Sequence, residues 1–523
     1  MKRLCLRFWP LIFIFAVWFV FASPYFLKGK APFAATYQLN NFAPWSAYPQ
    51  FAGPVKNGAM PDVITQIYPW RHLAIQIWKD GQVPLWNPYS FAGTPLLANY
   101  QSAVLSPFNI LFFVFPFVDA WSLLVLMQPL LAGIFIYIFV RALKRSRVAS
   151  VISAASFMFC GFITSWMGYG TLGYAILPLP LALFAVEKYF NTKKIRFLAL
   201  LSFTIPLSFF SGHFQISIYF LLSTFAYIVY KLIATKDLRS FLKASLFTAF
   251  GLLLAMPQLL PSIEFYSQSF RSDSFQKDEV IPLSYLPTLF APDFFGNPVT
   301  RNDWFGHWAE WNGFIGVIPL VLSLYAVTVK KKKEILFFLI VGTAALLFAL
   351  DTKLIDLLIM LKIPVLSTSA ASRDIVVYSF MFAVLSAFGF DGLVKDLKDK
   401  KIKKIAIFFS ILVALIILLW AAVYMGFHIP ALKTVIAKNN LKLPTLVFFL
   451  GVGIVFLSTL NKKFIYVCGL LLLILVSLDM LRFANKWQEF SPKNLVFANL
   501  PVASAFSQSA SFNRIMRNFG GEA

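Results

Sequence analysis

The sequence predicts an all-α polytopic membrane protein with about 13 transmembrane helices and a large first extracytoplasmic loop. The chain has 523 residues, of which 59% are hydrophobic and only 13% are charged, so it carries more apolar surface than soluble cores can bury. Apolar runs of about the length needed to cross 30 Å of hydrocarbon recur along it. Basic residues collect in alternate short connections between these runs, as expected for a membrane topology.

The first apolar run covers residues 8–26 and follows three basic residues. A cleaved signal peptide is the alternative, but Pro24 directly follows Ser23 and no Ala-x-Ala site stands out. We therefore favour an uncleaved first helix, and in either case the following loop is exported. The other runs lie near residues 119–140, 148–167, 172–189, 197–211, 213–231, 241–261, 311–329, 334–350, 373–394, 403–426, 443–460 and 464–483.

The distribution of charge agrees with a cytoplasmic N-terminus. The cytoplasmic segments then hold 27 of the 46 Lys and Arg residues and 6 of the 22 Asp and Glu residues, so the two faces carry net charges of +21 and +3. Short cytoplasmic loops show this positive bias. Membrane topology therefore explains the overall charge of +24, and this charge no longer indicates a nucleic-acid partner. We expect a multi-pass protein of the cytoplasmic (inner) membrane with its active face outside.

The chain divides into one predicted transmembrane domain and a tail. The domain covers residues 1–484 and includes two long extracytoplasmic loops, 27–118 and 262–310. Residues 485–523 form an extracytoplasmic tail that we expect to be truncated, because the sequence stops without a capped element. The cytoplasmic connections are short and rich in Lys, so a functional site is expected on the outer face.

Glycines interrupt the apolar sequence between residues 160 and 175. Gly161, Gly168, Gly170 and Gly173 lie there, and two prolines follow at Pro178 and Pro180. Such a segment indicates a broken helix or a re-entrant hairpin, which membrane proteins tolerate where it is buried in protein or lines a cavity.

The first loop contains the densest group of polar and aromatic residues, between residues 60 and 107. Asp62 follows Pro61 and begins a predicted helix that Pro69 would end or kink. A carboxylate there is favoured by the helix dipole, and its ordinary role is that of a cap. Its place in an exported loop beside the membrane surface makes it the candidate catalytic residue, since lipid-linked substrates present their head groups there.

The residues after Asp62 include candidate substrate ligands. Gln66 lies one turn further along the same helix face. Sugars bind through amides, carboxylates and flat aromatic rings, and a phosphate leaving group needs a cation. The alternative for the aromatic residues is an interfacial belt, and for the arginine it is a lipid anchor. The candidates in this segment are Gln66, Tyr68, Trp70, Arg71 and His72.

A turn-rich segment follows and supplies further candidates. Asp80-Gly81 predicts a turn, and two prolines frame Trp86-Asn87. Most residues of this segment are expected to shape the loop. The candidates for substrate contact are Trp86, Asn87 and Gln101.

These motifs resemble those of bacterial YfhO-like membrane proteins, which are related to the GT-C superfamily of polytopic glycosyltransferases. The specific part is the first-loop pattern. The resemblance extends to Ser372-Arg373-Asp374 at the start of a long apolar helix, and more weakly to Asp479 and Phe512-Asn513-Arg514-Ile515. YfhO-like chains are often longer after the last helices. The first-loop pattern is Asp62-x-x-x-Gln66-x-Tyr68-Pro69-Trp70, then Gly81-Gln82-Val83-Pro84-Leu85-Trp86-Asn87-Pro88, Gly93-Thr94-Pro95 and Ser106-Pro107.

The resemblance implies an inverting GT-C-type transfer of a sugar from a polyprenyl-phosphate donor to an envelope glycan or polymer outside the membrane. It assigns the acidic role in the first loop, general base or metal ligand, to Asp62. Arg71 and Arg373 are the candidates for the phosphate, and the alternative for Arg373 is pairing with Asp374. No second acid neighbours Asp62 in the sequence, so no cofactor is assigned and a divalent metal stays unsupported.

Other parts of the chain offer weaker candidates. His307 and Glu310 in the second loop are three residues apart and would share a helix face, but two ligands are too few for a metal site. His213 and Gln215 lie near the outer end of a helix, where either function or helix packing explains them. Two other functions stay open: a transporter or flippase of lipid-linked glycans, and a non-catalytic envelope assembly subunit in which Asp62 is only a cap.

Overall fold

The structure is a computed structural model, and it is helical almost throughout its described part. It describes residues 2–90, 93–269, 272, 279–329, 333–363, 366, 368–427, 429–460 and 464–502. The strands in this part form two short antiparallel pairs. The prediction of an all-α polytopic membrane protein is confirmed, since nine helical spans in the described ranges are long and apolar enough to cross a membrane, or ten with one bent pair.

Each predicted apolar run coincides with a helix or a helix pair, but the number 13 is not confirmed. The helices α10 (Ile195–Phe209), α13 (Val317–Ala326) and α14 (Lys333–Ala349) have only 15, 10 and 17 residues. A helix of 10 residues is about 15 Å long, which is half of the hydrocarbon thickness. The long spans are α1 (Lys2–Lys28), α5 (Phe117–Ala142), α8 (Leu172–Ile176) with α9 (Pro178–Thr192), α11 (Phe214–Thr235), α12 (Leu238–Ser267), α16 (Ile375–Lys398), α17 (Ile402–Tyr424), α18 (Thr434–Leu460) and α19 (Phe464–Trp487).

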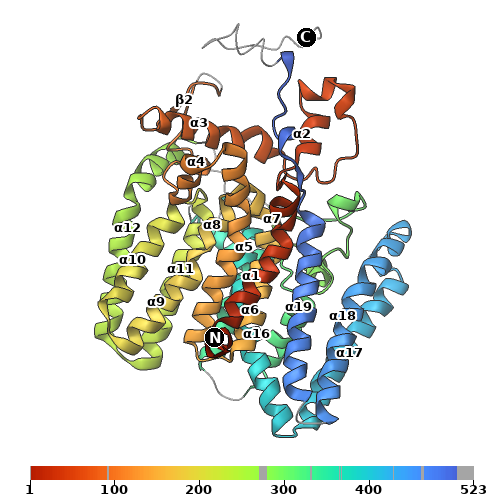
Figure 1. Cartoon of the computed structure of the whole chain (residues 1–523). Helices are drawn as coiled ribbons and strands as arrows, with labels where there is room; N and C mark the ends of the chain where they lie inside the picture. Colours follow the sequence, from red (N-terminus) through yellow and green to blue (C-terminus); the bar gives the residue numbers. More distant parts are fainter. Residues whose placement is uncertain are drawn as a thin grey trace.

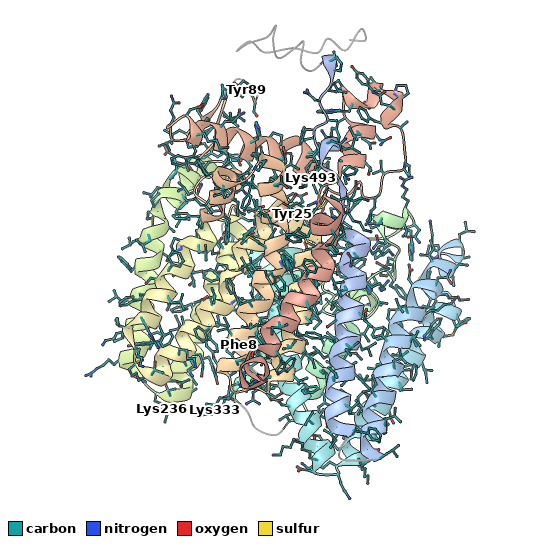
Figure 2. The ribbon with its side chains drawn as sticks, viewed as in Figure 1. Phe8, Tyr25, Tyr89, Lys236, Lys333 and Lys493 are labelled. Carbon is teal, nitrogen blue, oxygen red and sulfur yellow. The ribbon has the colours of Figure 1, made fainter. Side chains whose placement is uncertain are left out.

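The first loop gathers at one end of the bundle, which we call the loop end. The helices α2 (Ala35–Asn41) and α3 (Tyr68–Lys79) and the strand β2 (Trp86–Asn87) lie there, at the top of Figure 1. Figure 2 places Tyr89 at this end and Lys236 and Lys333 at the opposite end. The polar loop and the basic connections therefore occupy opposite ends, as the charge distribution predicts.

The chain returns to the first loop after the last long helix. The strand β4 (Ser491–Pro492) pairs with β1 (Lys30–Ala31), directly beyond the end of α1. The buried carboxylate of Glu489 accepts hydrogen bonds from the Thr36 backbone N–H at 3.1 Å and from its hydroxyl at 2.9 Å. The described start of the predicted tail is thus packed against the first loop, and the rest of it lies outside the described residues.

The helix α16 forms the centre of the bundle. Nearly all of its side chains are buried, including those on opposite faces of the helix. At Gly389 the helix approaches α13 so closely that a Cβ would lie 1.7 Å from the Leu322 carbonyl oxygen. By contrast, α17 is largely exposed and stands with α18 at the edge of the bundle in Figure 1. Arg373 and Asp374 lie in the 3-10 turn η10 (Ala371–Asp374), directly before this buried helix.

The expected break near residue 160 is present. The helices α6 (Arg147–Met158) and α7 (Gly161–Trp166) meet at an angle of 40°. Gly161 donates its N–H to the Phe314 carbonyl at 2.7 Å, and a Cβ on this glycine would lie 2.1 Å from the Asn312 Oδ1 atom. The break thus lets the chain contact the second long loop directly, and it positions the residues up to Tyr169.

Candidate functional site

Asp62 lies exposed at the start of the helical segment of the first loop. A π-helical turn covers Val63–Ile67, and α3 continues from it. The Asp62 side chain makes no capping hydrogen bond. Gln66 donates from Nε2 to Asp62 Oδ1 at 3.3 Å, so the two predicted residues do share one face. The capping role, which was the ordinary alternative, is therefore absent, and the carboxylate is free to contact a ligand.

The prediction that Pro69 ends this helix is wrong. Pro69 lies in the first turn of α3, and the helix continues to Lys79. A proline is tolerated in a first turn because its missing N–H would have no partner there. The wider π turn directly before it makes this position a helix start. Such π turns are rare and frequently mark functional sites.

Two aromatic residues that the sequence did not identify connect Asp62 to the interior. The hydroxyl of Tyr169 interacts electrostatically with the carboxylates of Asp62 and Glu310 and with Arg373. The Tyr169 ring packs edge-on against Trp166, at 4.9 Å between centroids. The guanidinium of Arg373 lies over the Trp166 ring at 5.3 Å from its centroid. Tyr169, at the end of the broken helix, is therefore within electrostatic range of both Asp62 and Arg373, two residues far apart in sequence.

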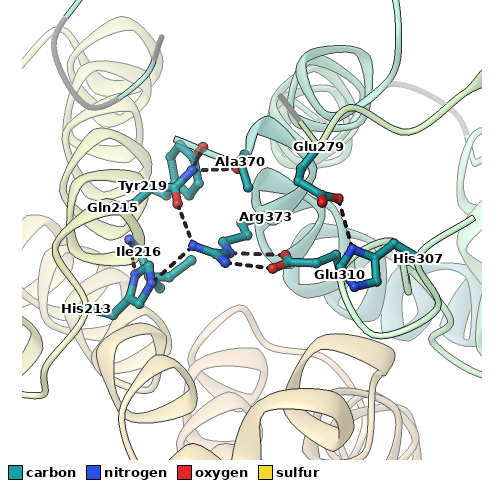
Figure 3. A network of polar contacts seen from close by, with 9 residues as sticks. All are labelled: His213, Gln215, Ile216, Tyr219, Glu279, His307, Glu310, Ala370 and Arg373. Carbon is teal, nitrogen blue, oxygen red and sulfur yellow. Dashed lines mark hydrogen bonds and ion pairs between the residues drawn. The ribbon is translucent and has the colours of Figure 1, made fainter. Parts of the chain in front are cut away.

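Arg373 and Glu310 form the ionic centre of this site. Arg373 donates from Nε to Glu310 Oε2 at 3.1 Å and from Nη2 to Oε1 at 2.6 Å, which is a two-point contact (Figure 3). The Glu310 carboxylate is buried and the arginine is only partly exposed. The suggested pairing of Arg373 with Asp374 is wrong, because the guanidinium turns to the second long loop instead.

A third side of the Arg373 guanidinium faces the start of α11. Its Nη1 atom lies 3.4 Å from His213 Nε2 and 3.5 Å from Gln215 Oε1. Gln215 in turn donates from Nε2 to the Tyr219 hydroxyl at 2.8 Å and to the Ala370 carbonyl at 2.7 Å (Figure 3). These contacts fix the arginine in one position. His213 and Gln215 therefore position the Arg373 guanidinium.

His307 and Glu310 do not share a helix face. Residues 308–310 form a turn, and the two side chains have different partners. His307 contacts the Glu279 carboxylate at 3.0 Å, while Glu310 binds Arg373. Across the described residues, no group of three His, Cys, Asp or Glu side chains is placed to hold a metal ion. The site therefore offers no complete set of metal ligands, and the proposal below uses protein groups only.

Arg71 is buried rather than presented to a ligand. It donates from Nη1 to Asn109 Oδ1 at 2.5 Å and from Nη2 to the Gly170 carbonyl at 3.2 Å. Its exposed fraction is 0%, and burial lowers the pKa of its guanidinium to about 10. The cation therefore joins the first loop to the broken helix, and of the two predicted phosphate ligands Arg373 is the one that stays partly exposed.

Tyr68, Trp70 and His72 point away from Asp62. Tyr68 is buried and stacks on Phe497 with 4.7 Å between ring centroids. Trp70 is partly buried against the core, and the His72 ring packs edge-on against Phe117 at 4.7 Å. These contacts with the protein interior occupy the three rings, whereas Asp62 and Gln66 are exposed.

The three later candidates are separate from this cluster. Trp86 is 52% exposed and begins β2, where it pairs with Pro95 of β3 (Thr94–Pro95), and its ring lies against Gly93. Asn87 is buried, where it accepts a hydrogen bond from the Tyr89 N–H at 2.9 Å and donates to the Ser90 hydroxyl at 2.8 Å. Gln101 lines a cavity of about 230 Å³ beside α12. Of the predicted residues, Asp62 and Gln66 are in contact, and Arg373 is related to Asp62 only through its electrostatic influence on Tyr169.

A signal for the two missed aromatics was present in the sequence. Trp166 and Tyr169 lie between Gly161 and Gly170, inside the segment predicted to be broken. Broken membrane helices frequently form binding sites where they interrupt the regular backbone. Polar or aromatic residues in such a break are therefore candidates, even though the surrounding apolar sequence suggests only core.

Solved structures with a similar arrangement include two membrane proteins. ArnT from Cupriavidus metallidurans bound to undecaprenyl phosphate has a TM-score of 0.46 and 11% sequence identity, over 85% of this chain and 75% of that chain. Its apo state gives a TM-score of 0.41, 10% identity and the same coverage. The apo oligosaccharyltransferase of Archaeoglobus fulgidus gives 0.36 and 14% identity, over 82% of this chain and 56% of that chain.

No curated protein sequence matches the chain. The sequence model of one family does match. It covers most of the chain and begins at the candidate catalytic residue Asp62. That family is described as bacterial membrane protein YfhO, and the match extends over residues 62–510. The chain therefore belongs to the bacterial membrane protein YfhO family.

Proposed function

We propose that this protein is an inverting membrane glycosyltransferase that moves a sugar from a polyprenyl-phosphate donor to an extracytoplasmic envelope glycan or polymer. One observation carries this proposal. An exposed carboxylate without a capping bond, Asp62, and a cation held directly before a membrane helix, Arg373, both act electrostatically on the hydroxyl of Tyr169. A base and a cation at the membrane surface are what this reaction requires.

The reaction needs one proton transfer and one exchange of bonds at the anomeric carbon. Asp62 takes the proton from the acceptor hydroxyl, whose oxygen forms a bond to the anomeric carbon. The bond between that carbon and the phosphate oxygen breaks, and the polyprenyl phosphate leaves with the electron pair. Attack opposite to the leaving group inverts the configuration. Gln66 holds the carboxylate from one side through its 3.3 Å hydrogen bond.

Arg373 is suited to stabilise the phosphate that leaves. Its guanidinium lies between Glu310 and the face of Trp166 and is therefore already oriented. Preorganised charges of this kind lower the barrier because they need no rearrangement as the negative charge develops. The Trp166 Nε1 atom has no hydrogen-bond partner among the described residues and offers one more donor beside the cation.

The location of the site favours a lipid-linked donor. The first loop lies at the end of the bundle opposite Lys236 and Lys333, as Figure 2 shows. The positive-inside bias favours a cytoplasmic position for these lysines, and the proposal puts the site outside the inner membrane. Nucleotide sugars are made in the cytoplasm, so a donor carried on a membrane lipid is the consistent choice. An envelope glycan is the acceptor class available on that side.

The donor class is tested with purified full-length protein in liposomes. Labelled sugar is supplied either on a synthetic polyprenyl phosphate or as the corresponding nucleotide sugar, together with an envelope-glycan acceptor. The proposal expects transfer from the lipid-linked donor only, with the anomeric configuration of the product inverted by NMR. Transfer from the nucleotide sugar alone, or retention of configuration, would contradict it. Movement of the intact lipid-linked donor across the bilayer without transfer would support the flippase alternative.

A further inference from the structure

A second polar feature lies on the other side of Arg373. The side chains of α11, α14, α15 (Lys353–Met360) and the start of α16 enclose a partly open cavity of about 270 Å³. Its lining is apolar except for Asp374, Tyr219 and Ser223. Ala226 and Ala344 line the cavity, and their small side chains leave it unfilled. The cavity has room for roughly nine groups the size of a water molecule, at about 30 Å³ each.

The carboxylate of Asp374 faces this cavity without a partner. It makes no capping hydrogen bond at the start of α16, and within the described ranges no donor or cation pairs with it. Its neighbour Arg373 is engaged by Glu310 instead. An acidic group in a membrane helix is costly unless it is paired, and such residues commonly mark functional sites. The missing partner of Asp374 is therefore best supplied by a ligand.

The hydroxyl of Tyr219 adds a second polar group to the cavity wall. It accepts a hydrogen bond from Gln215 Nε2 at 2.8 Å, which leaves its own O–H free to donate. Asp374 and Tyr219 also influence each other electrostatically. Together they offer an acceptor and a donor at one end of a space that is otherwise apolar. Gln215 connects this end to Arg373, so the cavity is adjacent to the proposed reaction site but separate from it.

We propose that this cavity binds a membrane lipid whose head group presents a hydrogen-bond donor, a hydroxyl or a primary amine, with its alkyl chain along the apolar wall. None of the described residues that line the cavity is a cation, so a phosphate or other anionic head group would have no counter-charge next to Asp374. A hydroxyl or ammonium group satisfies the acid, and the Tyr219 hydroxyl donates to the same head. The binding proposal stands independently of the proposed glycosyl transfer.

The test uses photoreactive lipids with the full-length protein in nanodiscs. Three probes share one alkyl chain with a diazirine and end in a hydroxyl, a primary amine or a methyl ether. Labelled peptides are identified by mass spectrometry. We expect the hydroxyl or the amine probe to label α11, α14 or α16 at least fivefold more than the ether. Preference for the hydroxyl identifies a neutral lipid, and preference for the amine identifies a cationic head.

Variants separate recognition by Asp374 from simple filling of an apolar space. Asp374→Leu should reduce the labelling by the preferred probe to the level of the ether. Ala344→Phe should block all three probes, because it fills the cavity. Ile340→Phe is the matched control on the same helix, since its side chain is 58% exposed on the outer surface, and it should label like the wild type. Equal labelling by the ether, or unchanged labelling of Asp374→Leu, would overturn the proposal.

Discussion

Arg373 holds Glu310 through two hydrogen bonds, of 3.1 and 2.6 Å, across a sequence separation of 63 residues. The pair fastens the second long loop to the start of the central helix α16. It also fixes the cation in the region that Asp62 reaches through Tyr169. The contact therefore has a structural and a functional consequence, and the two can be measured separately.

The structural consequence is a coupling free energy between the two side chains. Arg373→Met and Glu310→Met should each lower the stability by about 2 to 3 kcal/mol, because each leaves a largely buried charge without its partner. The double variant should lose less than the sum of the two, so a coupling of about 1 to 3 kcal/mol is expected. Thermal unfolding of the four purified proteins measures it. Additive losses would show that the contact contributes nothing to the fold.

The break at Gly161 provides a second test of how the site is held. Gly161→Ala places a Cβ 2.1 Å from Asn312 Oδ1 and 2.3 Å from the Asn312 carbonyl oxygen, so the helix break and the second loop must move apart. We expect a loss of more than about 2 kcal/mol, the range of overpacked cores. Gly453→Ala is the matched control, because nothing lies within 4 Å of its Cβ position. Equal melting temperatures of the two variants would contradict the close approach.

Much of the fold follows from the sequence because the membrane restricts it. Hydrophobic length located the long apolar helices between α1 and α19, and the glycine cluster indicated the break before α7, but the short apolar helix α15 was not predicted. The length of an apolar run alone could not separate spanning helices from shorter ones such as α13. This helix has 10 residues and lies between the second long loop and a basic connection. That distinction depends on how the second loop enters the bundle, which no local pattern records.

The site was predictable only in part. Asp62 and Gln66 share a helix face because of their spacing of four, and this relationship is local. The meeting of Asp62, Tyr169 and Arg373 depends on three segments that pack through tertiary contacts. Arg71 illustrates the same limit. The same local sequence is compatible with an exposed arginine that binds phosphate and with a buried arginine that is hydrogen-bonded to Asn109. Burial decides between them, and it is a property of the whole bundle.

Titration of His72 should contribute to the pH dependence of stability. Burial, and to a smaller extent the charge of Lys79, holds the pKa of His72 below its ordinary value. The folded protein then binds this proton less readily than the unfolded chain, so unfolding is favoured as the pH falls below about 6.5. His72→Gln removes the titration. Melting temperatures at pH 8 and pH 5.5 should differ less for the variant than for the wild type.

The control for this experiment is an exposed residue of the same helix. Gln76→Ala leaves His72 and its contact with Phe117 in place. It should therefore keep the pH dependence of the wild type. An identical change between pH 8 and pH 5.5 for His72→Gln and Gln76→Ala would show that the histidine does not take part.

The measurement that tests the account most directly is sugar transfer by Asp62→Asn. The exchange keeps the shape of the side chain but removes its ability to accept a proton, so we expect a loss of at least about 100-fold in rate, the lower range for a general base. Asp80→Asn, an exposed carboxylate at the end of the same helix, is the matched control and should stay active. Loss of transfer in Asp62→Asn alone, with unchanged melting temperature, is the predicted result. Equal transfer by both variants would contradict the central claim.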